Sequence, residues 1–359
     1  MNKVLLGDVA EEVRENYNET DGNPAVVGLE HLIPGEIRLK EWSEDTNTTF
    51  TKAFHKGQVL FGRRRAYLKK AAVAPVDGIC SGDITVISAK QDKILPELLP
   101  FVIQNDDFFD FAVGKSAGSL SPRVKWSRLK EYEFTLPSLP QQRKLAKLLW
   151  SFVDAKEAYE DLIRQTDELV KSQFIEMFGE PSKSDEAVPL ERAFEIRDDL
   201  RKPLNDVERS QMKEGQLYPY YGANGQVDTI NDYMIDGQAL CLAEDCGAYG
   251  AGDVTSYIIK GRSWVNNHAH VLFPRKECDI EYANAFFRIL DMSEYVSGTT
   301  RLKLTQGKMK EIPVVLPPMN EQRTFADIVE QSDKSKFELN EAIKDLDAMY
   351  KRIIKDNLG

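Results

Sequence analysis

The sequence predicts an α+β protein made of two similar halves, in which each half is a globular head followed by one long helix. Two observations carry this prediction. The octapeptide LPSLPQQR at 136–143 returns as LPPMNEQR at 316–323, and a long stretch without Gly or Pro follows each copy with the strongest apolar periodicity in the chain. A chain of 359 residues, 42% of them hydrophobic, can also supply two separate cores.

The repeat extends beyond the octapeptide and makes the whole chain an internal duplication. With a displacement of 180 positions, Gly57-Gln58 aligns with Gly237-Gln238, Gly118-Ser119 with Gly298-Thr299, and Lys130-Glu131 with Lys310-Glu311. One architecture is therefore used twice. Between these matches the halves diverge, as in RRRAYLKKAAV against AEDCGAYGAGDV, which indicates one frame with two different specificities.

The first head is predicted to cover residues 1–137 and the second head residues 181–316. We expect strands at Gln58–Phe61, Ile84–Ser88, Tyr132–Leu136, Tyr257–Ile259 and Pro313–Leu316, and short helices around Leu95–Phe111 and Tyr282–Leu290. Strands and helices do not alternate in a regular βαβ rhythm. Each head is therefore predicted to be α+β.

The segments 138–180 and 317–359 are predicted to hold the two long helices. Their uninterrupted parts, 141–178 and 320–358, would each be roughly 57 Å long at 1.5 Å per residue. The prolines before each helix hold the chain extended, and Asn320 can cap the second. Apolar residues in alternating steps of three and four predict the pairing positions Leu145, Leu148, Phe152, Ala155, Tyr159, Leu162, Thr166 and Leu169, and likewise Phe325, Ile328, Ser332, Ser335, Leu339, Ala342, Leu346 and Met349.

A long helix with a single apolar stripe needs a partner, because the stripe would otherwise face water. Each helix has an obvious partner in the other helix of the same chain. We therefore expect an antiparallel coiled coil with a pseudo-two-fold relation between the halves, and two heads held apart by a rod. Parallel pairing with a second molecule is the alternative.

The charge distribution predicts a surface that binds phosphate, although the net charge of −11 is unusual for a nucleic-acid binder. Basic residues gather in windows without Asp or Glu, which are Thr46–Val76, Phe111–Lys130, Val254–Lys276 and Val296–Lys310. Each half has two such windows in the same order. That recurrence favours a functional surface over the alternative of ordinary solvated faces.

Candidate contacts follow from side-chain chemistry in these windows and in two amide-rich segments. Arg63, Arg64 and Arg65 follow a strand-like segment, so at most two share a face, and Arg64 is the candidate for an internal ion pair. The loops 114–126 and 297–308 combine hydroxyls with cations, as phosphate-contacting loops and ordinary exposed turns both do. The segments YPYYGANGQ and WVNNHAHV carry amides suited to an adenine edge, although Tyr220 and Tyr221 can equally pack inside and only some of Asn266, Asn267, His268 and His270 can point outward.

The predicted DNA contacts are spread over both heads. In the first head they are Arg63, Arg64, Arg65, Lys69, Lys70, Lys115, Ser119, Ser121, Arg123 and Lys125. In the second head they are Tyr221, Asn224, Gln226, Arg262, Asn267, His268, His270, Thr299, Thr300, Arg301 and Lys303.

No catalytic cluster, cofactor site or metal site is expected. Gly114-Lys115-Ser116 lacks the earlier glycine of a phosphate-binding loop, because position 109 is Phe. Cys241 and Cys246 with His268 and His270 fit no common zinc spacing. The four cysteines suggest reduced thiols, and no stretch approaches the ~18 apolar residues of a membrane span. We therefore expect a cytoplasmic protein without a membrane partner.

In this order, these stretches resemble the DNA-specificity subunit of Type I restriction-modification systems. The resemblance runs through GQVLFGRRRAYLKKAAV and GICSGDITVIS in the first half, through YPYYGANGQVD and GTTRLKLTQGKMKEIPVVLPP in the second, and through LPxxxxQR with a long helix after each. It covers nearly the whole chain.

The resemblance implies two target-recognition domains that each read one half of a bipartite duplex-DNA site. It implies paired helices that act as a ruler and dock two methylation subunits, with restriction subunits as further partners. Such a subunit is not an enzyme itself, since methyl transfer, translocation and cleavage belong to its partners. Target-recognition domains vary widely in this family, so the contact residues above rest on charge and side-chain chemistry alone. The alternative is an assembly scaffold whose heads bind other proteins.

Overall fold

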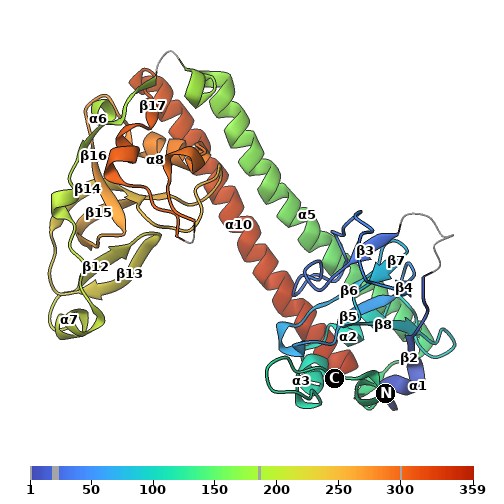
Figure 1. Ribbon diagram of the computed structural model, residues 1–359. Coiled ribbons are helices and arrows are strands. Elements are labelled where there is room, and N and C mark those ends of the chain that lie inside the picture. The colour runs from blue at the N-terminus through green and yellow to red at the C-terminus, as the bar shows by residue number, and fades with distance from the viewer. Residues whose placement is uncertain (1, 18–23, 185–186, 300) are drawn as a thin grey trace. The chain divides into compact units, whose positions relative to one another are not determined.

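The computed structural model describes residues 2–17, 24–184, 187–299 and 301–359 (Figure 1). It divides into two compact units, the first made of Met1–Glu160 and Asn340–Gly359 and the second of Asp161–Leu339. Each unit contains one head with a part of each long helix. These helices are α5 (Leu139–Phe178) and α10 (Met319–Leu358), so both predicted long helices are present and begin one or two residues earlier than expected.

The first head is built from short strands in separate small sheets. Among its described residues, β2 (Ala10–Val13), β8 (Ile84–Ala89), β5 (Val59–Gly62) and β6 (Ala71–Val73) form an antiparallel sheet in that order. A second sheet has the order β3 (Ala25–Val27), β7 (Gly78–Cys80), β4 (Lys52–Phe54), and β1 (Asn2–Leu5) pairs with β9 (Glu133–Leu136). The helices are α1 (Leu6–Val9), α2 (Leu99–Ile103), α3 (Asp106–Gly114) and α4 (Trp126–Leu129).

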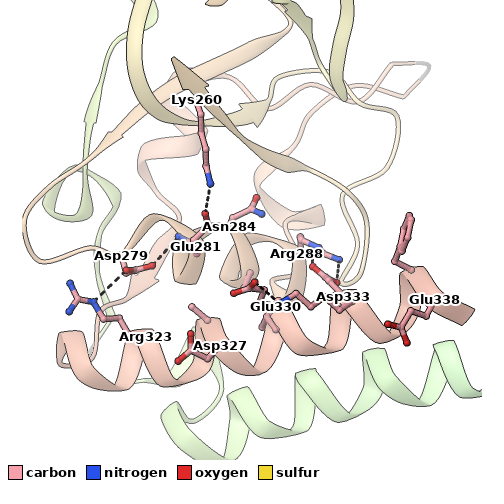
Figure 2. A pocket seen from close by; sticks show the side chains of 15 residues that line it. Lys260, Asp279, Glu281, Asn284, Arg288, Arg323, Asp327, Glu330, Asp333 and Glu338 are labelled. Atoms are coloured by element: carbon pink, nitrogen blue, oxygen red, sulfur yellow. Dashed lines mark hydrogen bonds and ion pairs between the residues drawn. The ribbon is translucent and has the colours of Figure 1, made fainter. Parts of the chain in front are cut away.

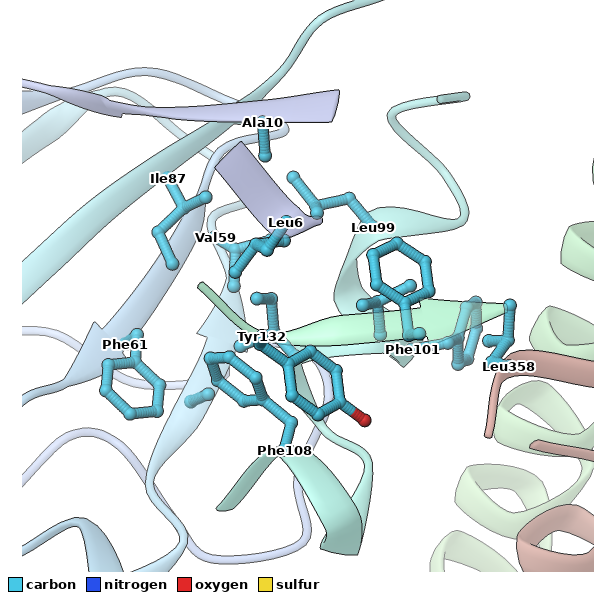
Figure 3. Packing of buried hydrophobic residues seen from close by; sticks show 14 of the residues in the cluster. Leu6, Ala10, Val59, Phe61, Ile87, Leu99, Phe101, Phe108, Tyr132 and Leu358 are labelled. Carbon is cyan, nitrogen blue, oxygen red and sulfur yellow. The ribbon is translucent and has the colours of Figure 1, made fainter. Parts of the chain in front are cut away.

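The core of the first unit joins the head to both long helices. Figure 3 shows Leu6, Phe61, Phe101 and Tyr132 in one buried cluster, together with Leu358 from the last turn of α10. Leu149 of α5 belongs to the same cluster. The ring of Trp150 on α5 lies 5.0 Å from that of Phe101, edge to face. The helix ends in this unit are therefore parts of the head's own hydrophobic core.

The second head contains a larger mixed sheet. Its order is β11 (Phe194–Ile196), β16 (Ala269–Pro274), β14 (Ile235–Ala243), β15 (Ser256–Val265), β12 (Tyr218–Gly222), β13 (Gly225–Ile230), with β12 parallel to β15. A separate pair joins β10 (Ala187–Pro189) to β17 (Pro313–Val315), and the helices are α6 (Leu190–Ala193), α7 (Asp206–Gln211), α8 (Ile280–Ile289) and α9 (Gln306–Lys310). The prediction of mixed α and β structure in both heads is confirmed.

The second unit also packs both long helices into its core. Phe174 of α5 lies 5.4 Å from Phe325 of α10 and 5.8 Å from Phe286 of α8, measured between ring centroids. All three side chains are fully buried. Aromatic contacts therefore hold α5, α10 and the head together within this unit.

The buried stripe of the long helices is displaced from the predicted pairing positions. Leu145 and Phe325 are buried as expected, and Phe152, Ala155, Tyr159, Thr166, Ile328, Ser332, Leu339, Ala342 and Leu346 are half-buried. Leu148, Leu162, Leu169 and Met349 are instead exposed, and so is Ser335. The predicted burial is wrong at these five positions. On α5 the stripe runs one residue further along, through Ala146, Leu149, Val153 and Lys156, because this part of the helix packs against the head as well as against α10.

An ion pair joins the two long helices within each unit. In the first unit Lys156 of α5 lies 3.1 Å from the carboxylate of Asp347 on α10. In the second unit Lys336 of α10 lies 2.6 Å from the carboxylate of Asp167 on α5. A displacement of 180 residues converts one pair into the other. The two ion pairs therefore use equivalent positions of the sequence repeat.

Candidate nucleic-acid interface

The first head brings two of the predicted basic stretches together. The chain after β5 runs beside a hairpin at residues 117–123, whose ends are joined by the backbone hydrogen bonds Ala117 N to Arg123 O (3.0 Å) and Arg123 N to Ala117 O (2.9 Å). The amide of Arg65 donates to Pro122 O at 2.8 Å, and the amide of Val124 donates to Arg63 O at 3.0 Å. The arginine run and the hairpin therefore form one surface.

Among the residues that the structure describes, the carboxylate of Asp83 lies between the arginines of this surface. Arg123 donates to both of its oxygens, at 2.7 and 3.1 Å, and Arg64 lies 3.5 Å from it. The hydrogen bond from Arg123, together with the charges of Arg123, Arg64 and Arg63, holds the pKa of Asp83 below its usual value despite partial burial. One negative charge faces several positive ones, so the surface keeps a net positive charge.

The three consecutive arginines have different roles in this arrangement. Arg64 also donates to Ser121 Oγ at 3.2 Å, and with Asp83 it makes the internal ion pair that was the alternative to a DNA contact. Arg63 is half-buried, whereas Arg65 is exposed and has φ of 54°, a left-handed conformation that is rare for a residue with a side chain. This backbone turn separates Arg65 from its two neighbours.

The lysines predicted as contacts make interactions inside the first head but keep exposed surface. Lys69 pairs with Asp106 at 2.6 Å, and Lys70 donates to Leu29 O at 2.7 Å. The ammonium of Lys115 lies 5.4 Å from the centre of the Phe111 ring. Ser119 within the hairpin and Lys125 just after it are both exposed, on the same part of the head as the arginines.

The second head contains the same hairpin 180 residues later. Ser297 and Lys303 exchange backbone hydrogen bonds of 3.0 and 2.8 Å, and Gly298 has φ of 103°, close to the 113° of Gly118 in the first head. Only glycine adopts such angles readily. Thr299 is exposed, and Thr300 lies outside the described residues.

Next to the second hairpin, acidic residues take the place of the arginines that lie next to the first. The two residues after β14 are Glu244 and Asp245, at the positions where the first half has Arg64 and Arg65. Lys303 lies 2.7 Å from Glu244, and Arg301 lies 2.5 Å from Asp245. Both cations are more than half exposed. They remain candidate contacts, but any phosphate has to compete with these carboxylates.

Two histidines of the second head, both predicted as contacts and only two residues apart, have separate environments. His270 is fully buried, and its two ring nitrogens lie 2.8 Å from Asp198 Oδ2 and 2.9 Å from Leu304 O. Burial favours a higher pKa for Asp198, but hydrogen bonds from His270 and Gln306 and the charges of His270 and Arg201 hold it below its usual value. His270 therefore fixes the hairpin from inside rather than reaching a ligand.

His268 is the more accessible histidine. Its Nδ1 lies 2.9 Å from Asp245 Oδ1, which fixes the orientation of the ring. Asn267, next to it, is exposed, whereas Asn266 is buried. Of this group, His268 and Asn267 are the side chains that can reach a ligand.

The remaining predicted contacts lie around β12, β13 and β15. Asn224 and Gln226 are exposed at the hairpin between β12 and β13, whereas Tyr221 is half-buried against the ring of Tyr257, 5.6 Å away. Tyr220 is buried, which was the alternative for this residue. Arg262 pairs with Asp236 at 3.1 Å and stacks over Tyr233 at 4.8 Å. Its exposed guanidinium is held in one place by these contacts.

A pair of buried glutamines was missed as functional residues by sequence reasoning. Gln142 donates to Pro137 O (3.0 Å) and Lys93 O (3.1 Å) and accepts from the amide of Leu95 (2.9 Å). Gln322 repeats all three contacts in the second unit, with Pro317 O, Glu277 O and the amide of Asp279. The signal was present, since both residues belong to LPxxxxQR. The motif joins each long helix to its head through this amide as well as through its prolines.

The second unit also has a large charged groove between α8 and α10. Its volume is about 940 Å³, and Figure 2 shows Arg288 of α8 paired with Asp333 of α10, at 2.9 Å, in its wall. Asp279 and Arg323 face each other at one end. The groove is lined by both acidic and basic side chains, and its described residues do not form a cluster of hydrogen-bond donors that would suit a cofactor or a phosphate.

No grouping of three or more metal-ligating side chains occurs in the part of the chain that the structure describes. Cys241 is buried within β14, and the ring nitrogens of His270 already have partners. Among the described residues, no helix combines the length and apolar character required to cross a bilayer.

Comparisons with known proteins identify a family. The model of the Type I restriction modification DNA specificity domain matches residues 6–165 and 194–346. A putative type I restriction enzyme specificity subunit of Haemophilus influenzae is 29% identical over 145 residues, which are 40% of this chain and 36% of that protein. The type I restriction enzyme MjaIX specificity subunit of Methanocaldococcus jannaschii is 33% identical over 141 residues, 38% of this chain and 32% of that protein. These matches span about a third of each relative.

Solved structures show the same fold along the whole chain. The S subunit of the Type I restriction-modification system from M. genitalium has a TM-score of 0.58 at 14% identity and covers 100% of this chain and 96% of its own. A chain solved in a study of complex assembly and conformational transition of the type I R-M system has a TM-score of 0.59 at 19% identity, with coverages of 99% and 97%. With one domain match in each half, the chain belongs to the Type I restriction-modification DNA specificity family.

Proposed function

We propose that this chain is the subunit that reads a bipartite site in duplex DNA, one half with each head, and that partner subunits carry out the chemistry. The observation that carries the proposal is the repeated hairpin at 117–123 and 297–303, which presents hydroxyl and cationic side chains in both heads. Such side chains position a protein on the DNA backbone, and the divergent segments beside them can read bases. The differing charges around the two hairpins fit two different half-sites.

The long helices serve in this proposal as an antiparallel coiled coil that sets the distance between the two half-sites. Support comes from two ion pairs between the helices, Lys156–Asp347 and Asp167–Lys336. The residue number increases along α5 and decreases along α10 from the first pair to the second, as antiparallel helices require. Antiparallel pairing about a pseudo-two-fold axis produces both pairs at once. A rod of fixed length then allows any sequence in the spacer between half-sites.

Methylation subunits, two by the symmetry of the duplication, dock on the long helices. Leu148, Leu162 and Leu169 are exposed on α5 at steps of fourteen and seven residues, so they lie along one face of the helix. These leucines border the half-buried Tyr159 and Thr166 on the same helix. Exposed leucines at heptad spacing offer a partner helix an apolar seam, and restriction subunits join through the resulting complex. A cytoplasmic location follows from a role on cellular DNA.

The experiment that tests DNA reading measures affinity over a series of salt concentrations. The complex with cognate methylation subunits is titrated with a duplex that carries the methylated motif mapped in cells and with a scrambled duplex. The variant Arg65→Ala should weaken binding to both duplexes and reduce the slope of log K against log salt by about one. The control Arg14→Ala removes an exposed arginine elsewhere on the first head, one that pairs with Glu12, and should change neither value. Equal affinity for both duplexes in the wild-type complex would contradict the proposal.

A further inference from the structure

Leu120 is the most exposed large hydrophobic side chain in the described part of the chain, with 90% of its surface accessible. It stands at the tip of the 117–123 hairpin, between Ser119 and Ser121. Exposure of the leucine side chain to water is unfavourable compared with its burial, and a polar side chain at this position would not have that cost. The tip of a hairpin is also where a side chain projects furthest from the protein.

The hairpin does not need this leucine in order to fold. Its counterpart in the second head has the same paired ends and a glycine in the same conformation, yet the residue 180 positions after Leu120 in the sequence is Thr300. The apolar tip is therefore a property of the first head alone. A role specific to that head explains it better than a role in the shared architecture.

The base of the hairpin is held rigidly. Beyond the backbone pair between Ala117 and Arg123, the amide of Arg65 donates to Pro122 O and Arg64 donates to Ser121 Oγ. Asp83 holds Arg123 through two hydrogen bonds. A side chain on such a support keeps its position when it is pressed against a partner.

The surroundings identify the partner by charge. Arg64, Arg65, Arg123 and Lys125 lie around the hairpin base, and Asp83 pairs with Arg64 and Arg123. An apolar protein groove or a membrane interior would not bind this ring of cations. A polyanion with stacked bases can bind the cations through its phosphates and the leucine through its apolar base faces. Proteins that insert leucine between base pairs combine the same two elements, a cationic rim and an apolar tip.

We propose that Leu120 is a wedge that enters one base step of the half-site read by the first head and partly unstacks it. The inference rests on the proposed function and adds a deformation to it. Pyrimidine–purine steps such as TA and CA unstack most easily, so the first head should prefer such a step opposite Leu120 without any hydrogen bond to its bases. The second head, whose sequence has Thr300 at the position that corresponds to Leu120, should leave its half-site stacked.

The test scans the mapped motif with 2-aminopurine, a base whose fluorescence rises when it is unstacked. Each adenine position in both half-sites is replaced in turn, and the complex with methylation subunits is added. We expect a rise of several-fold at one step in one half-site only. Leu120→Ala should abolish the rise and lower affinity for the motif about tenfold, because most of the buried side chain is lost. Leu120→Met should keep the rise.

The matched control is Val254→Ala, which truncates a side chain that is 60% exposed in the second head and should change nothing. Specific binding without a fluorescence rise at any position, or a rise that persists in Leu120→Ala, overturns the wedge and leaves DNA reading intact. Failure of the wild-type complex to prefer the motif over a scrambled duplex overturns the proposed function itself. The two failures are thus distinguishable.

Discussion

Replacing Gln142 with leucine should destabilise the first unit much more than its position at a helix start suggests. The side chain is 1% exposed and makes three hydrogen bonds, to Pro137 O, Lys93 O and the amide of Leu95. Leucine has a similar size but leaves all three backbone groups without this partner. At about 1 kcal/mol for each lost bond, the free energy of unfolding should fall by about 3 kcal/mol.

The assay is urea denaturation combined with hydrogen exchange, so that the two units are observed separately. The control is Gln141→Leu, the neighbouring residue, whose exposed amide oxygen accepts from Ser138 N and Oγ and whose loss should cost under about 1 kcal/mol. Gln322→Leu should produce the same loss in the second unit instead. If Gln142→Leu were no more destabilising than Gln141→Leu, the buried amide would not be what joins helix to head.

Three further outcomes follow from the same structure. Leu162→Glu with Leu169→Glu should reduce binding of methylation subunits at least tenfold in a pull-down titration and leave the unfolding midpoint unchanged; a lower midpoint with normal binding would exclude these exposed residues as the docking seam. Asp83→Asn should lower the free energy of unfolding of the first unit by about 1–2 kcal/mol in urea, because Arg123 and Arg64 lose their shared carboxylate. The hydrogen bond from His55 to Glu15 raises the pKa of His55 above its ordinary 6.5, so its stabilisation is complete below that pH and disappears as pH rises through the raised value. Urea midpoints between about pH 5 and 9 should show this fall in the wild type and not in His55→Gln, and parallel curves would contradict it.

Features set by local sequence could be predicted. The absence of Gly and Pro with a strong periodicity located α5 and α10 to within two residues. In each case the deciding interactions lie within a few residues of one another.

Features set by tertiary packing could not be predicted. The buried stripe of α5 follows Leu149 and Lys156 because the first head and Asp347 lie on that side, and neither is visible in the periodicity of the helix itself. The contact between Arg65 and Pro122 joins segments 57 residues apart. The carboxylates that hold Arg301 and Lys303 are those of Glu244 and Asp245, more than fifty residues earlier in the sequence, and sequence reasoning did not foresee these pairs.

The central claim is that the paired helices set the distance between two half-sites, and matched insertions test it most directly. Four residues added after Asp161 and four after Glu341 lengthen both helices by about 6 Å and keep the helical phase nearly unchanged. Methylated sites are then mapped by sequencing the DNA of cells that express the altered complex. The proposal predicts unchanged half-sites separated by a spacer that is longer by one to two base pairs of about 3.4 Å. A spacer of the original length would contradict it.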